Sequence, residues 1–398
     1  MNRLQPTPSA ISRIQSIDLL RGIIMIIMAL DHVRDFIHAP AFIQDPLDFN
    51  TTTPLLFFTR WITHYCAPIF VFLAGASAYL QSLRKNKKDL SIFLIKRGLW
   101  LILIEISVMS LAFTFDPAYP VFILQTIWAI GISMVILGLV IWLPFAAILT
   151  TGLIIVVGHN FLDFYEAAHK GEYSLVYSLI HRFGFYPLWG KHTLQVFYPF
   201  LPWTGLMLLG YCFGRLFTEY EGNQRTKILT WLGLGMIVFF IVLRATNAYG
   251  DAQHWSIQKN VLYTVFSFVN TVKYPPSLLF MCMTIGPAIL FLAWFKNARS
   301  VLSKIIMVYG RVPFLYYILH FYLVHFICMA LFFARGHSFA EGWRTNPNLP
   351  FNFVIPGEGY SLGIVYLVWF LMIVALYPIC KWFSDYKMKH KNWWLSYL

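Results

Sequence analysis

Residues 16–38 read SIDLLRGIIMIIMALDHVRDFIH, and this stretch decides the fold because it combines the length of a bilayer-spanning helix with charge at both ends. The ionisable residues that flank its apolar middle are Asp18, Arg21, Asp31, His32, Arg34, Asp35 and His38. Ionisable groups inside a membrane are energetically costly, so they normally face a protein interior or a water-filled cavity. The stretch therefore predicts a first membrane span that carries functional residues.

The polar groups of this predicted helix gather on one face. At about 100° per residue, a stripe roughly 100° wide holds Asp18, Arg21, Met25, Met28, His32 and Asp35. Asp31 and His38 lie on a different face, and Pro40 biases the chain out of the helix just beyond His38. We expect the stripe to face the interior; the alternative is that these groups merely cap the helix and meet lipid headgroups.

The composition excludes an ordinary soluble protein. Of the 398 residues, 59% are hydrophobic and 12% are charged, and the mean hydropathy is +0.64. Charged residues normally make up about a quarter of a soluble domain, and several runs here approach the roughly 20 apolar residues that a helix needs to cross a bilayer. We therefore expect a single integral-membrane domain over residues 1–398, an all-α helical bundle whose surroundings are the lipid bilayer.

The apolar runs predict about ten spans. The second covers residues 55–83, and the densest basic loop follows it, with Arg84, Lys85, Lys87, Lys88, Lys96 and Arg97. Later spans are expected at residues 98–114, 121–142, 144–158, 198–217, 228–247, 276–296, 303–334 and 361–383, with a single kinked or re-entrant segment as the alternative where two runs meet at 142–144. Alternating the loops from a cytoplasmic N-terminus places every basic cluster inside, so both termini are predicted to be cytoplasmic.

The positions of the charged residues and the spacing of the cysteines and histidines argue against nucleic-acid binding, a disulfide and a metal site. The net charge of +13 comes from Lys and Arg in short loops between apolar runs, which indicates membrane orientation and not nucleic-acid binding. The five cysteines all fall within apolar segments without CxxC spacing: Cys66, Cys212, Cys282, Cys328 and Cys380. The long loops at 159–197, 248–274 and 335–360 hold scattered histidines without HxxxH or HExxH spacing. We expect no metal site and no disulfide.

Two histidines share a depth in the predicted bundle. His32 lies about 14 residues into the first span, ~21 Å along its axis. His320 lies at a similar depth in its own span, so the two can meet, and Glu105 and Gln125 are further polar groups within apolar runs. A histidine beside carboxylates in a partly desolvated site is suited to general-base catalysis, and the pattern is typical of acyl transfer. The same groups also suit the proton relay of a carrier.

The run Ser16-Ile-Asp18-Leu-Leu-Arg21-Gly22, followed by an apolar helix that reaches His32, resembles the opening motif of the transmembrane acyltransferase superfamily. In the acyltransferase-3 group a comparable run leads to a catalytic histidine at the position of His32. A closer resemblance is to the DUF1624-type bacterial relatives of heparan-alpha-glucosaminide N-acetyltransferase. It rests on the opening motif, the His38-Ala-Pro run, residues 67–78 (APIFVFLAGASA) and the segment from Tyr309-Gly-Arg311 to His320.

The two resemblances nominate different bases. In the heparan enzyme the catalytic histidine belongs to a His-Ala-Pro run, which points to His38, and an asparagine stands at the position of His32. This chain departs in the spacing before His-Ala-Pro and has no large luminal domain. Either His32 or His38 is therefore the predicted base, with Asp31 or Asp35 orienting it and His320 beside it.

The resemblance implies an acyltransferase of the cell inner membrane. It would move an acetyl or other short acyl group from cytoplasmic acetyl-CoA, as cosubstrate, to the amine or hydroxyl of a carbohydrate on the far side. Asp18, Arg21 and Arg311 are the residues predicted to bind the donor, since Arg21 and the basic loops attract CoA phosphates. The rival function is a proton-coupled carrier of a polar solute, and a homo-oligomer is compatible with the sequence.

Overall fold

The structure is a computed structural model that describes residues 14–169, 171–295, 299–343 and 349–396. The N-terminal residues 1–13 and the last two residues, for which the sequence predicts a cytoplasmic position, lie outside the described residues. The first half of the described chain contains α1 (Gln15–Ile37), α2 (Pro54–Ile62), η1 (Thr63–Tyr65), α3 (Cys66–Ser82), α4 (Lys87–Ile104), η2 (Glu105–Met109), α5 (Ser110–Thr114), β1 (Val121–Leu124), α6 (Thr126–Val140), α7 (Phe145–Gly158), α8 (Phe161–Ala168), α9 (Leu175–Ile180), β2 (Gly184–Pro187) and β3 (Thr193–Val196).

The second half is helical throughout its described elements. It contains α10 (Phe200–Gly214), α11 (Leu216–Glu219), α12 (Gly222–Thr246), α13 (Val261–Val269), α14 (Leu278–Trp294), α15 (Val301–Arg311), α16 (Pro313–Ala334), α17 (Phe339–Gly342), α18 (Leu362–Lys389) and η3 (Trp393–Ser396). The fold is thus a helical bundle, as the composition predicts.

Six stretches of the described chain are helical, long and apolar enough to cross a membrane. They are Pro54–Ser82, Phe145–Ala168, Phe200–Glu219, Gly222–Thr246, Pro313–Ala334 and Leu362–Lys389. Two shorter apolar helices, α6 and α14, accompany them. The predicted count of about ten spans is not confirmed. α1 is long enough but differs in composition, because charged residues stand at both of its ends.

Several predicted spans have different boundaries in the structure, among them the span expected at 98–114, because its helix α4 already begins at Lys87, within the predicted basic loop. The run 303–334 is two helices, α15 and α16, since Pro313 lacks an N–H and begins a new helix instead of continuing the old one. The run 121–142 opens with β1 before α6 begins at Thr126. Residues 141–144 separate α6 from α7, so the two runs that meet there form two helices.

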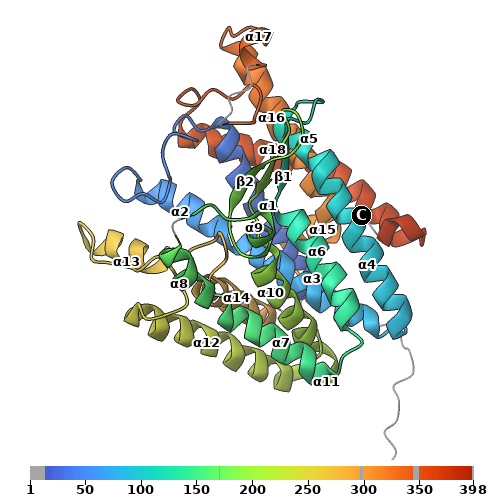
Figure 1. The fold of residues 1–398 in the computed structure, drawn as a ribbon. Helices are drawn as coiled ribbons and strands as arrows, with labels where there is room; N and C mark the ends of the chain where they lie inside the picture. The colour runs from blue at the N-terminus through green and yellow to red at the C-terminus, as the bar shows by residue number, and fades with distance from the viewer. Residues whose placement is uncertain (1–13, 170, 296–298, 344–348, 397–398) are drawn as a thin grey trace, which may run out of the picture.

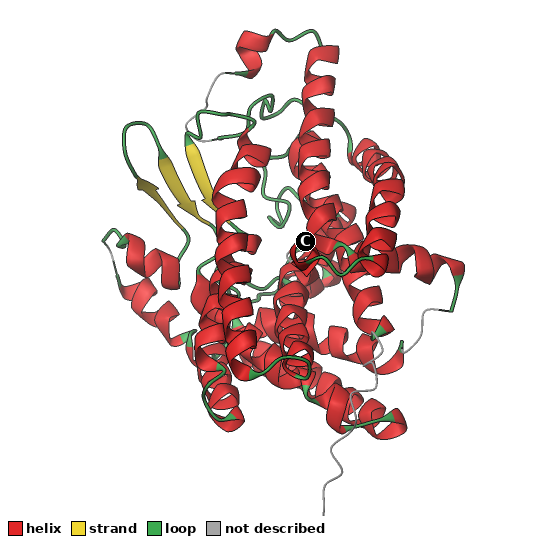
Figure 2. Cartoon of the chain, turned by 90° about the vertical axis from the view of Figure 1, so that its right-hand side faces the viewer, coloured by secondary structure: helices red, strands yellow, loops and turns green. Residues whose placement is uncertain are grey.

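A small three-stranded sheet accompanies the helices of this predominantly helical fold. β3 lies in the middle, pairing in parallel with β1 and antiparallel with β2. Figure 2 shows this sheet at the side of the helical bundle. Its strands have four residues each, too short for a period-2 pattern to be distinguished from the apolar run that follows.

α1 is the helix around which the rest pack. It contacts α3, α14, α15, α16 and α18, and Figure 1 shows it in the middle of the bundle. The approach of α15 is so close that a side chain at Gly310 would collide with the Asp18 carbonyl oxygen, and one at Gly22 with the Ile306 carbonyl. Small residues at such crossings allow tight helix packing in membranes. Of the ionisable groups of α1, Asp18, Asp31 and Arg34 are buried within the protein.

Candidate active site

Two cavities among the described residues follow α1. The first, the basic cavity, is lined by Arg21, Met25, Met28, Phe70, Ala74, Ser77, Ala78, Gln81, Phe93, Leu94, Arg97, Leu101, Thr126, Ile127, Ile130, Met134, Gly310, Arg311, Pro313, Phe314, Tyr317 and Lys387. The second, the histidine cavity, is lined by Met28, Asp31, His32, Asp35, Phe36, Phe42, Arg60, Thr63, Cys66, Ala67, Phe70, Phe113, Gln125, Thr126, Phe197, Tyr198, Lys273, Tyr274, Phe321 and Phe351. Met28, Phe70 and Thr126 line both, so the two cavities adjoin there.

The polar stripe of α1 faces these cavities. Arg21 and Met25 line the basic cavity, and His32 and Asp35 line the histidine cavity, with Met28 between them. The prediction that this stripe faces the interior is confirmed for these five residues. Asp18 is buried but lines neither cavity, because its part of the helix is pressed against α15.

His32 and His320 are in direct contact, as their predicted depths require. Nδ1 of His32 lies 2.7 Å from Nε2 of His320, and the two rings stack. His320 is fully buried in α16, and its Nδ1 lies 3.0 Å from the carbonyl oxygen of Tyr316. The pair thus joins α1 to α16 at the wall of the histidine cavity.

These contacts assign the tautomers of both neutral rings. A carbonyl oxygen only accepts, so Nδ1 of His320 carries the proton and its Nε2 is an acceptor. Nδ1 of His32 must then donate to that acceptor, which leaves the lone pair of His32 on Nε2. No described residue hydrogen-bonds to that Nε2, so the arrangement presents an unengaged base on a residue that lines the cavity.

The two carboxylates near His32 are held by arginines. An NH2 group of Arg34 lies 2.9 Å from Oδ1 of Asp31 and 2.7 Å from Oδ1 of Asp35. Arg60 binds the other oxygen of Asp31 at 2.5 Å. Neither carboxylate is hydrogen-bonded to His32 among the described contacts, and His320 occupies the position expected for the orienting group. The carboxylates instead neutralise cations beside the base.

His38 lies just beyond the end of α1, away from both cavities. Its backbone N–H donates to the Arg34 carbonyl at 3.0 Å and it bridges to the backbone of Tyr360. Burial, with the nearby Arg34 cation, lowers the pKa of the His38 imidazole. Its position on the chain, between the helix and the loop at Pro40, separates it from the His32–His320 pair.

Lys273 and Tyr274 are cavity residues that the sequence did not single out. Both lie in the short connection between α13 and α14, and both line the histidine cavity. Burial would raise the pKa of the Tyr274 phenol, but the Lys273 and Arg60 cations outweigh it and lower that pKa. The available signal in the sequence is a lone lysine directly before an apolar helix, and the prediction of an outer loop over residues 248–274 obscures it.

Glu105 and Gln125 meet each other near the histidine cavity. Oε1 of Glu105 accepts from the backbone N–H of Gln125 at 2.7 Å, and Gln125 lines the cavity. Glu105 begins η2, a π-helical turn, and its Oε2 is buried without a described partner. π-helical turns within helices occur frequently at functional sites.

The basic cavity has a different chemistry. Four cations line it and none of its lining residues is acidic: the cations are Arg21, Arg97, Arg311 and Lys387. Arg21 is fixed by its NH2 group, which donates to the Leu73 carbonyl at 2.9 Å and to the Ser77 hydroxyl. Most of the remaining lining is aliphatic or aromatic. The cavity can therefore receive a molecule with an anionic head and an apolar or neutral arm.

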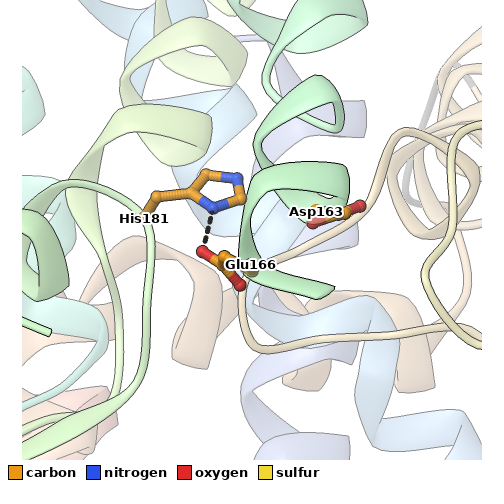
Figure 3. Close-up of side chains that lie close together, drawn as sticks. All are labelled: Asp163, Glu166 and His181. Atoms are coloured by element: carbon orange, nitrogen blue, oxygen red, sulfur yellow. Dashed lines mark hydrogen bonds and ion pairs between the residues drawn. The ribbon is translucent and has the colours of Figure 1, made fainter. Parts of the chain in front are cut away.

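A second polar cluster lies outside these cavities. Asp163 and Glu166 of α8 approach His181, as Figure 3 shows, with their possible ligand atoms within 4.8 Å of one another. Glu166 already pairs with His181 Nδ1 at 2.9 Å and with Arg182 at 3.0 Å. The other nitrogen of His181 contacts His159 at 3.0 Å. Asp163 in turn accepts from the side chain of Asn160 at 2.7 Å. The possible ligand groups are thus engaged by other protein groups, and this network carries no independent sign of a metal.

Residues 13–246, more than half of the chain, match the family model described as heparan-alpha-glucosaminide N-acetyltransferase, catalytic. The matched range includes α1 with His32, and it includes Met28, Phe70 and Thr126, which line both cavities. It ends before α16, the helix that carries His320. No curated protein matches the chain.

Proposed function

Since the chain belongs to the family of the heparan-alpha-glucosaminide N-acetyltransferase catalytic region, we propose that it is a membrane acyltransferase that moves an acetyl or other short acyl group from acyl-CoA to a sugar. The observation that carries this proposal is the pair of adjoining cavities with unlike chemistry. The basic cavity is the donor site and the histidine cavity is the acceptor site. The acyl group passes where Met28, Phe70 and Thr126 line both.

The basic cavity suits CoA because of its charge. CoA carries several phosphate groups, which four lining cations can neutralise without competition from a lining carboxylate. The apolar part of the cavity suits the pantetheine arm and brings the thioester toward the boundary residue Met28. Arg21 and Arg311 are the donor-binding residues in this proposal, whereas Asp18 is buried in the α1–α15 crossing and lines neither cavity.

His32 is the proposed general base. Its Nε2 takes the proton from the acceptor amine or hydroxyl as the acceptor atom bonds to the thioester carbonyl carbon. The carbon–sulfur bond then breaks, and the CoA thiolate leaves and takes up the proton that His32 removed from the acceptor, which returns His32 to its neutral form. His320 positions the ring by accepting from Nδ1, and the Arg34 and Arg60 pairs keep Asp31 and Asp35 neutralised beside it.

The basic residues support the sidedness of the proposed reaction. Arg97 and Lys387 line the basic cavity and belong to clusters that the positive-inside rule assigns to the cytoplasm. We therefore place the donor site on the cytoplasmic side of the inner membrane, where both termini also lie, and the sugar acceptor on the opposite side.

The test is transfer by the purified protein. Incubated with labelled acetyl-CoA and a panel of amino sugars, the reconstituted protein should label at least one sugar, and acetyl-CoA should raise its melting temperature. If acetyl-CoA gave no thermal shift, and the same liposomes dissipated a gradient of a polar solute, the enzyme would be abandoned in favour of a proton-coupled carrier. The buried charges of α1 would then be relay groups.

A further inference from the structure

One residue of the histidine cavity has an unusual backbone. Phe42, in the loop between α1 and α2, has a φ of 64°, in the left-handed region that favours glycine. Bulky residues persist in this strained conformation only where the surrounding structure holds them, and they gather at active sites and ligand clamps. Phe42 is 45% exposed and also lines the histidine cavity, so it lies at the mouth of that cavity.

Packing does not explain this conformation as it does elsewhere. The described chain has four other residues besides glycine with a positive φ, and none of them lines either cavity: Phe115, Tyr119, Asn247 and Phe353. Phe353 is buried, and Phe115 stacks on a histidine ring at 3.7 Å. Phe42 is nearly half exposed, so burial of its ring compensates for the backbone strain only in part.

A second ring at the mouth lies against Phe42. The ring centres of Phe42 and Phe351 are 5.4 Å apart, with planes inclined by 38°, and both rings line the cavity. The segment that carries Phe351 is fixed by the next residue. Asn352 donates its backbone N–H to the Thr114 carbonyl at 3.2 Å, and its own carbonyl oxygen lies 2.9 Å from Nε2 of His325. We call Phe42 and Phe351 the aromatic platform.

The aromatic lining continues from the platform toward the base. The ring centre of Phe351 lies 5.5 Å from that of Phe36, which also lines the cavity. Phe36 follows His32 by one turn of α1, about 6 Å along the helix axis. A molecule that rests on the platform can therefore direct a polar group inward, past Phe36, to Nε2 of His32.

An aromatic platform recognises the shape of a sugar. One face of a closed sugar ring presents C–H bonds, whose partial positive charge suits the negative face of an aromatic ring. An open chain with the same polar groups must lose more conformational freedom before it can present such a face. The contact therefore distinguishes a ring from a chain without using charge.

We propose that Phe42 and Phe351 bind the acceptor by stacking on its sugar ring, and that they make the protein select a closed ring over an open chain. This inference rests on the proposed acyl transfer and identifies two residues that determine acceptor recognition. The platform holds the ring at the mouth of the cavity while the amine or hydroxyl points inward to His32.

The experiment compares two acceptors with the full-length protein in liposomes at saturating acetyl-CoA. Glucosamine and its reduced form, glucosaminitol, both carry an amine and several hydroxyls, but only glucosamine closes into a ring. We expect glucosamine to be favoured by about tenfold or more in kcat/KM. Phe42→Gly should remove most of that preference by raising the KM for glucosamine with kcat little changed, and Phe42→Tyr should retain it.

Glycine separates the loss of the ring from damage to the fold. Because glycine adopts a positive φ without strain, Phe42→Gly should remain folded, which its thermal shift with acetyl-CoA checks. Phe351→Leu removes the other ring and should raise the same KM. Tyr119→Gly is the matched control, since Tyr119 is also an aromatic residue with a positive φ, of 51°, and lines neither cavity. It should leave the preference intact.

The inference fails if the two acceptors react alike, if Phe42→Gly keeps the preference, or if Tyr119→Gly removes it equally. It also fails if Phe42→Gly lowers kcat for both acceptors by the same factor, because the ring would then support only the shape of the cavity. Transfer to no sugar at all would instead be a failure of the proposed function.

The platform can be tested by binding if glucosamine is not acetylated. Glucosamine should then raise the melting temperature of the unaltered protein more than glucosaminitol does, and Phe42→Gly should erase that difference. Equal shifts with the two compounds, or a difference that survives in Phe42→Gly, would overturn the platform.

Discussion

The basic cavity and the histidine cavity lie along the same helix, yet they handle charge in opposite ways. In the basic cavity, four cations face the space with no acidic lining residue. In the histidine cavity, arginines and carboxylates are paired at 2.5–2.9 Å around a neutral histidine pair. The first arrangement attracts a polyanion, and in the second the arginines and carboxylates neutralise one another beside the base.

This difference arises within a few turns of α1. Arg21 lies on one side of Met28 and His32 on the other, so a single helical stripe supplies both the donor-side cation and the base. The boundary consists of side chains without charge. The thioester of the donor and the acceptor can therefore meet at this boundary, while the charged residues that bind each of them stay in separate cavities. The following variants test whether the two cavities are separate in function.

The largest expected effect is on the base of the histidine cavity. His32→Ala removes the nitrogen proposed to accept the acceptor's proton, and a general base typically contributes about 10²–10⁴-fold. Turnover should fall by at least about two orders of magnitude. The measurement is the rate of labelled acetyl transfer under saturating substrates.

Acetyl-CoA binding is the control for that variant, because the basic cavity does not include His32. His32→Ala should keep the thermal shift that acetyl-CoA produces. Near-normal turnover in this variant would show that the base lies elsewhere.

The next effect concerns the partner of the base. His320→Leu leaves Nδ1–H of His32 without its acceptor, and an unsatisfied buried donor costs about 1–3 kcal/mol. If the unsatisfied donor destabilises the reactive orientation of the His32 ring by that amount, turnover should drop roughly 10- to 100-fold. His320→Gln keeps an acceptor oxygen near the lost Nε2 and should recover part of the rate.

The pH profile separates positioning from simple damage. A poorly held His32 should titrate differently, so the acidic limb of kcat/KM should move in His320→Leu and return toward normal in His320→Gln. Equal activity and identical pH profiles for the two variants would argue against a positioning role.

A smaller effect is expected in the basic cavity. Arg311→Gln removes one of four lining cations and should raise the KM for acetyl-CoA about tenfold, a loss of roughly 1.4 kcal/mol. Turnover at saturating donor and the KM for the sugar should change little, and added salt should shrink the difference. Arg225→Gln, at an arginine that stacks on Phe217 outside both cavities, is the matched control. A change in sugar KM alone would contradict the division between the cavities.

The sequence predicts the part of this comparison that depends on one regular helix. Periodicity alone places Arg21, Met28 and His32 on one face, and residue counting brings His320 to the depth of His32. A regular helix makes such positions calculable from the rise and twist per residue.

What the sequence does not predict depends on contacts between distant segments. Lys273 enters the cavity because the connection between α13 and α14 folds inward, and no periodicity describes a connection. β1 and β3 pair across about 70 residues of chain, and strands of four residues leave little pattern. The boundaries of the predicted spans differ from those of the helices for a related reason. A single residue such as Pro313 interrupts a helix within an apolar run, because it changes the backbone without changing the polarity of the run.

The smallest effect is expected at His38, the other candidate base. It lies beyond the end of α1 and lines neither cavity, so His38→Asn should lower turnover by less than about tenfold, well under the contribution of a general base. Its effect should appear instead in the pH dependence of stability. Burial and the Arg34 cation lower the pKa of His38 in the folded protein below 6.5, so the unfolded chain binds its proton more readily. The folded state is therefore favoured above pH 6.5 and loses that advantage as the pH falls through the lowered pKa. His38→Asn should flatten the decline of melting temperature below pH 6.5, measured at fixed detergent and salt. If it instead abolished transfer while His32→Ala remained active, the base would be His38 and the comparison between the two cavities would have to be redrawn around the end of α1.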